Sequence, residues 1–271
     1  MLRLLTMISL AALALLAGCT GNATPTPPLE PLALVTEAAE NIRAAETFRI
    51  SVTQDGPDYM LPTEYGTAVF RSATAQFVSP REMQANVRVI AAGLPIQIDV
   101  FSRGADQWYR AIWTGNQWLN QPFQEGFNPE TLVSEEAGFQ SALDALLELN
   151  YVGETALESG AQVYHLTATA NGPDVSALLG GLIEPVGEVI VDVYIERETR
   201  QPVRFVIQEF NSPYAATPEA GEEDEPVVWT IDLYDIDAPP ELDPPEEGAG
   251  DTPDDGFVGE PSLDAEATPE S

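Results

Sequence analysis

The stretch Glu82–Ile90 reads EMQANVRVI, and apolar and polar side chains alternate along it. Met83, Ala85, Val87 and Val89 take every second position, and polar or charged residues take the positions before and between them. A period of two is typical of a β-strand, because successive side chains point to opposite faces of the sheet. The stretch therefore predicts a strand with one apolar face, called the dry face below, and one polar face, called the wet face.

The same period continues on both sides of this stretch. In Leu94–Arg103 (LPIQIDVFSR), Ile96, Ile98 and Val100 again occupy alternate positions. Gly, Pro, Ser and Asp separate these short segments, which favours an antiparallel meander with tight connections. The other segments with strand character are FRISVTQ (48–54), GTAVFRSATAQF (66–77), DQWYRAIW (106–113), YVGETALE (151–158), QVYHLTATA (162–170), GEVIVDVYIE (187–196), PVRFVIQEF (202–210) and PVVWTIDLY (226–234).

Three further segments have helical character. Apolar residues recur at three-to-four spacing in Leu32–Ile42 and in Glu136–Asn150, and Val175–Ile183 is a short apolar segment. A long, twisted antiparallel sheet must either close or curl over something, and these helices are the available filling. We therefore predict an α+β fold, in which a curved antiparallel sheet of about ten or eleven strands packs against helices.

The two ends of the chain differ from this core. Residues 20–31 are rich in Pro and Thr and predict, with Cys19, a flexible linker over 19–31. Residues 237–271 hold twelve Asp or Glu, seven Pro and no basic residue, and they predict a disordered acidic tail over 238–271. The domain itself is expected over residues 32–237, which is long enough for one sizeable core.

The first eighteen residues have the layout of a secretory signal. Arg3 precedes an apolar run whose helix would span roughly 22 Å, against a hydrocarbon core of about 30 Å. The run ends in Leu16-Ala17-Gly18-Cys19, and this is the one Cys of the chain. This order resembles the bacterial lipobox, in which the Cys is lipidated and becomes the first mature residue. It implies a signal peptide over 1–18 and a lipoprotein held by Cys19 on the extracytoplasmic face of a membrane.

Composition excludes several classes of function. The 271 residues include 11 basic residues, all of them Arg, against 44 Asp or Glu, for a net charge of -33. This balance argues against nucleic acid and against a polybasic membrane-binding patch. A chain with no Lys, one His and one Cys cannot build a lysine-dependent site, a multi-histidine metal site or an internal disulfide. We expect no cofactor and no metal.

Few residues remain as candidates for catalysis or binding. His165 lies inside a strand with no nucleophile motif to accompany it, which favours a structural or cavity-lining role and a protein that is not an enzyme. Neither 222–225 nor the group Asp232, Asp235 and Asp237 has the spacing of a calcium loop. The aromatic cluster around 108–118 packs on the sheet or, in Trp113 and Trp118, lines the mouth of a cavity. The sequence allows both positions for these aromatic side chains.

An ordered set of features resembles a known family. A Trp follows a Gly turn and precedes a Pro-led segment and a Leu-rich segment. Then come a Gly-Glu pair, a small-residue turn and a Tyr-His-Leu strand, and finally an acidic-Thr turn followed by a Pro-Val-Arg strand. The residues that carry this order are Trp118, Pro129, Leu143–Leu149, Gly153, Glu154, Gly160, Tyr164–Leu166, Glu198, Thr199 and Pro202–Arg204. With the lipobox, they resemble the LppX/LprAFG lipoprotein family, whose fold is similar to that of the lipoprotein carrier LolA.

The resemblance implies a half-barrel whose concave apolar face, roofed by helices, forms a lipid-binding cavity. It implies an acyl lipid or glycolipid ligand, a membrane and an envelope transport protein as partners, and transfer between membrane and outer envelope. Leu178, Leu179 and Leu182 would form a movable lid. The candidate cavity residues are Val87, Val89, Ile96, Ile98, Val100, Leu178, Leu179, Leu182, Val189, Val191, Val193, Phe205 and Ile207.

A different class of function also accommodates these features. The sheet would then be fully filled, and the acidic loop at 212–225 or the acidic tail would recruit an envelope partner, making the protein a scaffold rather than a carrier. The same apolar residues would serve as ordinary core. The spacing of these residues along the chain does not distinguish a cavity lining from a filled core.

Overall fold

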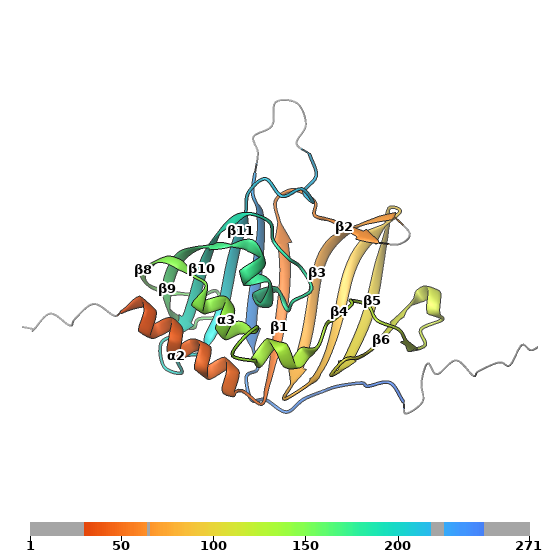
Figure 1. Cartoon of the computed structure of the whole chain (residues 1–271), viewed down its shortest axis with the longest axis horizontal. Helices are drawn as coiled ribbons and strands as arrows, with labels where there is room; N and C mark the ends of the chain where they lie inside the picture. Colours follow the sequence, from red (N-terminus) through yellow and green to blue (C-terminus); the bar gives the residue numbers. More distant parts are fainter. Residues whose placement is uncertain (1–29, 64–65, 218–224, 247–271) are drawn as a thin grey trace, which may run out of the picture. The chain divides into compact units, whose positions relative to one another are not determined.

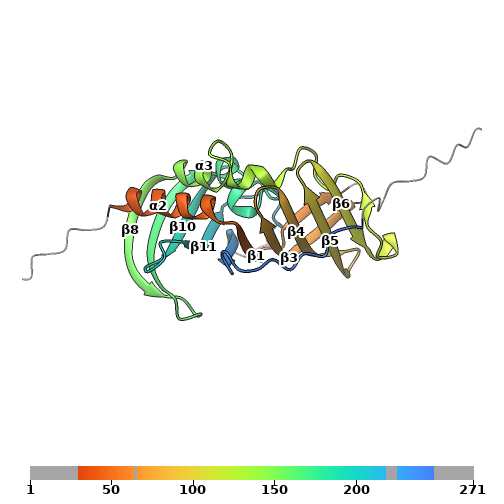
Figure 2. The same cartoon turned by 90° about the horizontal axis from the view of Figure 1, so that it is seen from below.

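The computed structural model describes residues 30–63, 66–217 and 225–246. Twelve strands among these residues form one antiparallel sheet, which is curved (Figures 1 and 2). The strands are β1 (Thr47–Asp55), β2 (Met60–Thr63), β3 (Gly66–Val78), β4 (Glu82–Ala91), β5 (Leu94–Arg103), β6 (Asp106–Ala111), β7 (Leu119–Asn120), β8 (Leu147–Ala156), β9 (Gln162–Asn171), β10 (Glu188–Glu196), β11 (Pro202–Glu209) and β12 (Val227–Tyr234).

The order of the strands joins the beginning of the chain to its end. The sheet runs β7-β6-β5-β4-β3-β1-β12-β11-β10-β9-β8, and β2 pairs with β3 outside this path. Consecutive strands pair as hairpins from β3 to β7 and from β8 to β12, whereas β1 lies between β3 and β12 at the centre of the sheet, with Val52 opposite Ile231. The sheet therefore consists of two meanders, one running from β1 to β7 and the other from β8 to β12, which meet at the pair β1–β12.

The predicted strands are present, and two short ones were not anticipated. β2 and β7, of 4 and 2 residues, are too short to show a period of two. The predicted helix over 136–150 is shorter than expected. It begins at Phe139 and ends at Asp144 as α3, and β8 starts at Leu147. Leu147 and the residues after it instead satisfy backbone hydrogen bonds by pairing with β9, which overrides their helical spacing.

The helical segments lie on one side of the sheet (Figure 2). α2 (Pro31–Ala44) contacts β8, β10 and β11, and α3 contacts α2 and two further helical segments. These segments are the 3-10 helices η2 (Pro129–Val133) and η3 (Gly172–Leu179), and η3 also contacts β9. The segment predicted as a helix over Val175–Ile183 thus begins earlier, at Gly172, and ends at Leu179.

The core is filled mainly in the half of the sheet that these helices cover. Val191, Val193, Phe205 and Ile207 on β10 and β11 are completely buried. The ring of Phe139 from α3 stacks on Phe205 with centroids 6.4 Å apart, and meets Phe48 of β1 edge-on at 5.8 Å. Helix side chains therefore occupy the space above β8 to β12. The dry face of β3 to β5 has no α-helix packed on it in the contacts of the described residues.

The beginning of the predicted acidic tail has a defined place on the sheet. Residues 235–246, called the strap below, run past one end of β1, β3 and β4 (Figure 1). The Thr47 hydroxyl donates a hydrogen bond to the carbonyl oxygen of Ala238, and the backbone N–H of Asp243 donates one to Gln84 at 2.7 Å. Polar side chains of the sheet thus bind the strap as far as Asp243, which lies within the segment predicted as a tail. Residues 247–271 lie outside the described part of the chain.

Candidate functional site

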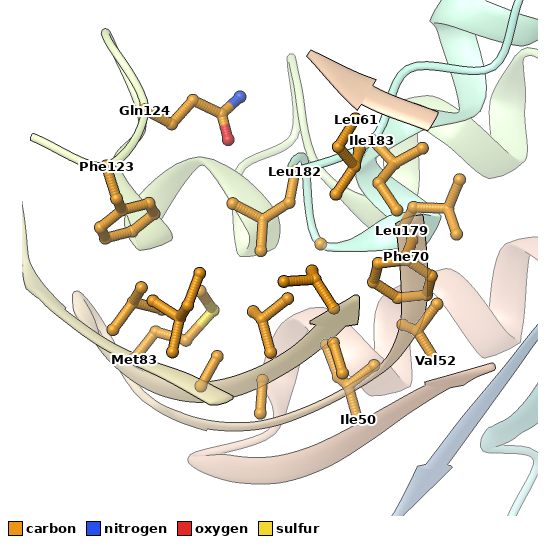
Figure 3. A pocket seen from close by; sticks show the side chains of 18 of the residues that line it. Ile50, Val52, Leu61, Phe70, Met83, Phe123, Gln124, Leu179, Leu182 and Ile183 are labelled. Atoms are coloured by element: carbon orange, nitrogen blue, oxygen red, sulfur yellow. The ribbon is translucent and has the colours of Figure 1, made fainter. Parts of the chain in front are cut away.

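A pocket of about 240 Å³ lies on the dry face of the half of the sheet on which neither α2 nor α3 packs (Figure 3). Its floor comes from β1, β3, β4 and β5, its roof from Leu179–Ile183, and one wall from Phe123 and Gln124. The lining residues are Ile50, Val52, Leu61, Ala68, Phe70, Ala73, Ala75, Met83, Ala85, Val87, Val89, Ile98, Val100, Phe123, Gln124, Leu179, Gly180, Leu182 and Ile183. All of them except Gln124 are apolar.

Small side chains on the floor leave this space open. Ala75 of β3 lies between Ile50 of β1 and Ala85 of β4, so two neighbouring strands present single methyl groups to the pocket. In the filled half, cross-strand neighbours on the dry face are large. For example, Ile207 of β11 lies directly opposite Trp229 of β12. Since protein interiors are normally close-packed, an apolar hollow of this kind is the usual form of a ligand site.

A reversal of the chain after η3 forms the roof. Gly180 and Gly181 both have φ of +69°, in the left-handed region that glycine adopts without strain. The two residues turn the chain back, so that Leu179, Leu182 and Ile183 all lie over the floor (Figure 3). The roof therefore begins at the last residue of η3 and continues as a loop through Ile183.

One buried side chain fixes the wall. Gln107 of β6 is 5% exposed, and its amide makes four hydrogen bonds to one loop. Its Nε2 donates to the carbonyl oxygens of Gln124 and Phe127, and its Oε1 accepts from the N–H groups of Phe123 and Gln124. The loop 123–127 is thereby attached to the edge of the sheet, and the Gln124 side chain projects from it towards the roof (Figure 3).

A buried polar cluster lies where the pocket meets the filled core. Glu209 is completely buried, and its carboxylate accepts hydrogen bonds from Val186 N–H at 3.0 Å and from Trp229 Nε1 at 3.4 Å. The Trp229 ring packs on Phe70, a pocket residue, and on Tyr59. Burial, and after it the negative charge of Glu209, raises the pKa of Tyr59 well above its usual range. The cluster holds the chain just after the roof against the sheet.

The structure divides the predicted cavity residues into two groups. Val87, Val89, Ile98, Val100, Leu179 and Leu182 line the pocket. The other seven do not line it: Ile96 is partly exposed, and the rest belong to the core of the filled half, namely Leu178, Val189, Val191, Val193, Phe205 and Ile207. Alternation identifies the dry face correctly, but it does not show which part of that face the helices cover.

Several pocket residues were not anticipated. The candidate cavity residues do not include the floor alanines Ala73, Ala75 and Ala85, which occupy dry-face positions of two strands. A cluster of small residues on the apolar face of neighbouring strands is a signal that could have located the hollow. Phe123 and Gln124 had no such signal, because they lie in a loop and reach the pocket only through the contacts of Gln107.

The remaining candidates lie away from the pocket. His165 faces the wet side of β9, where its Nε2 is 2.9 Å from Asp192 Oδ1 and its ring stacks on Tyr194. Trp113 is exposed, whereas the Trp118 ring contacts Phe101 and the guanidinium of Arg110. Trp118 thus packs on the sheet, and neither tryptophan lines the pocket.

The acidic candidates are engaged in ion pairs and hydrogen bonds. Asp232 pairs with Arg204, Asp235 pairs with Arg49, and Asp237 accepts a hydrogen bond from the N–H of Glu46. In the described residues, no three His, Cys, Asp or Glu side chains are grouped in a way that could hold a metal ion. Residues 222–224 and Cys19 lie outside the described part of the chain. No helix of that part is long and apolar enough to cross a membrane.

Comparison with known proteins identifies related chains. The model of the LppX_LprAFG lipoprotein family matches residues 30–238. The structure of LprF from Mycobacterium bovis has a TM-score of 0.56 and 12% sequence identity, over 79% of this chain and 96% of that one. LppX from Mycobacterium tuberculosis gives 0.50 and 14%, over 79% and 98%. Among curated protein sequences, none matches. At these identities the likeness to the solved structures concerns the fold.

Proposed function

Because this chain belongs to the LppX_LprAFG lipoprotein family, we propose that it binds a lipid or lipid-linked glycan and carries it between the membrane and the outer envelope. The acyl part of the ligand lies in the pocket between the β1–β5 floor and the roof Leu179–Ile183. The protein acts as a binding protein and not as an enzyme.

One observation carries this proposal, namely an apolar pocket in a half of the sheet that no α-helix fills. Each CH₂ group moved from water into apolar surroundings gains about 0.8 kcal/mol, so a chain that occupies the pocket is stabilised in proportion to its length. The lining contains no titratable and no nucleophilic side chain. Such a lining holds a hydrocarbon chain but offers no group for acid–base or covalent chemistry.

The anchor is the second part of the proposal. Lipidation of Cys19 holds the protein on the extracytoplasmic face of the membrane, and the linker 19–31 gives the pocket access to lipid. A Cys19→Ala variant should move from the membrane fraction to the soluble fraction, whereas Thr20→Ala should remain with the membrane. Equal membrane retention of the two variants would refute anchoring through Cys19.

The binding test uses the exported chain with Cys19→Ala, examined by native mass spectrometry together with lipid extraction. We expect a co-purifying lipid at one equivalent. Ala85→Phe, which places a ring in the pocket, should abolish it, and Ala105→Phe, in the exposed turn between β5 and β6, should not. A clean apo mass with no uptake from envelope lipids would overturn the carrier function.

A clean apo mass would leave the alternative function, a scaffold that recruits an envelope partner through its acidic loop or tail. Deletion of 247–271 separates the two functions, because it removes most of the acidic tail but keeps the strap on the sheet. Lipid binding should survive this deletion, whereas recruitment of an envelope partner through the tail should fail.

A further inference from the structure

Gln124 is the one polar side chain in the lining of the pocket. A polar group among apolar lining residues orients a ligand, because it gives the polar end of that ligand a partner in otherwise dry surroundings. The Gln124 side chain is therefore expected to select among lipids by the chemistry of their polar ends.

The hydrogen bonds of Gln124 determine which way its amide faces. Its Nε2 donates to the carbonyl oxygen of Gly181 at 2.9 Å. That carbonyl can only accept, so the amino group must face the roof and Oε1 must face the other way. Figure 3 shows Oε1 directed towards the cavity. No hydrogen bond from the described residues reaches Oε1, so the amide presents an unused acceptor to a ligand.

The loop that carries this acceptor is held in place before any ligand arrives. The buried amide of Gln107 bonds both the N–H and the C=O of Gln124, and the rings of Phe123 and Phe127 pack at 5.4 Å. Two separate contacts, from Gln107 to the backbone and from Gly181 to the side chain, thus position Oε1. A preorganised acceptor binds its partner with little further loss of conformational entropy.

The size of the pocket limits the apolar part of the ligand. An apolar cavity of about 150 Å³ holds one benzene molecule, which has six carbons. By proportion, the pocket of about 240 Å³ has room for roughly ten carbons, which is one alkyl chain rather than two.

We propose that the pocket holds one alkyl chain whose polar end donates a hydrogen bond to Gln124 Oε1. The ligand end is then a hydroxyl or an amide N–H, and an ether, an ester or a carboxylate, which offers only acceptors, is disfavoured. This inference rests on the proposed function, because it requires that the pocket binds a lipid chain.

Two isomers test the inference, 1-decanol and 1-methoxynonane, which have the same atoms but differ in the hydroxyl donor. Their affinities are measured by displacement of a fluorescent apolar probe from the exported full chain with Cys19→Ala. We expect the alcohol to bind about three- to tenfold more tightly, the effect of one net hydrogen bond. Gln124→Met should abolish the preference, and Gln97→Met, on the wet face of β5, should keep it.

A second variant separates the acceptor from the contact with the roof. Gln124→Glu keeps acceptor oxygens but loses the donation to Gly181, while Gln107 still holds the backbone; the preference for the alcohol should therefore persist but become smaller. Equal binding of the two isomers to the unmodified pocket, or a preference that survives Gln124→Met, would overturn the inference while leaving lipid binding intact. If neither isomer displaces the probe at any concentration, the proposed function fails as well.

Discussion

The completely buried carboxylate of Glu209 accepts a hydrogen bond from the backbone N–H of Val186 at 3.0 Å. The contact joins β11 to the chain that leaves the roof of the pocket, three residues after Ile183. A buried carboxylate is costly unless its oxygens are satisfied, and here Trp229 Nε1 serves the second oxygen at 3.4 Å. The position of the roof therefore depends on a polar contact within an apolar core.

Replacement of Glu209 by Ala should destabilise the protein by about 2–4 kcal/mol. The change leaves the N–H groups of Val186 and Trp229 without their partner and opens a cavity. Urea denaturation measures the loss, and Glu188→Ala, at an exposed position of β10, should cost less than about 0.5 kcal/mol. A cost below about 1 kcal/mol for Glu209→Ala would show that the buried contact is not needed.

Replacement of an alanine by leucine should affect the free energy of unfolding differently in the two halves of the sheet. Ala85→Leu adds apolar side chain to the hollow of the pocket, so its effect on the free energy of unfolding should stay within about 0.5 kcal/mol or be stabilising. Ala168→Leu enlarges a buried side chain of β9 in the filled half and should cost about 1–3 kcal/mol. Equal costs in thermal or urea unfolding would mean that the pocket is not open space.

The strap should stabilise the sheet weakly and in a salt-dependent way. Arg49–Glu241 and Arg110–Asp243 are ion pairs at 2.9 and 3.0 Å, and both acids are largely exposed. Exposed pairs contribute about 0–1 kcal/mol each and are screened by salt. Deletion of 240–271 should therefore lower the Tm by a few degrees at low salt, relative to deletion of 247–271. A difference that is unchanged in 1 M NaCl would assign the effect to the backbone hydrogen bonds of the strap instead.

Tyr59 should make stability fall at alkaline pH. Burial and the charge of Glu209 raise the pKa of Tyr59 in the folded state, so above about pH 10 the unfolded chain loses this proton first. The contribution is fully present below about pH 10 and decreases as the pH rises further. Tyr59→Phe should flatten this part of the stability profile, measured by urea denaturation between pH 8 and 11. An alkaline slope that is the same with and without the Tyr59 hydroxyl would contradict this prediction.

The local pattern of the chain predicts much of the fold. The alternation in Glu82–Ile90 places Met83 and Val89 on the dry face, where the structure buries both. The spacing in α2 likewise predicts most of its buried face: Val35, Ala39 and Ile42 are buried, whereas Leu32 is exposed. These properties can be predicted because the direction of a side chain depends on the backbone period alone, which is two in a strand and 3.6 in a helix. The helix predicted to continue to Asn150 shows the limit, since pairing with β9 decides where β8 begins.

The sequence by itself determined the strands, their apolar face and the features that resemble the lipoprotein family. Only the tertiary structure decided which part of that face is hollow. Val87 and Val191 follow the same alternation, yet Val87 lines the pocket and Val191 lies in the filled core. The difference arises because α2 and α3, which are far from β4 and β10 in the sequence, cover one half of the sheet. Gln124 reaches the pocket for the same kind of reason, through the distant side chain of Gln107. Side-chain direction is a local property, whereas the space left between packed segments depends on contacts between distant parts of the chain.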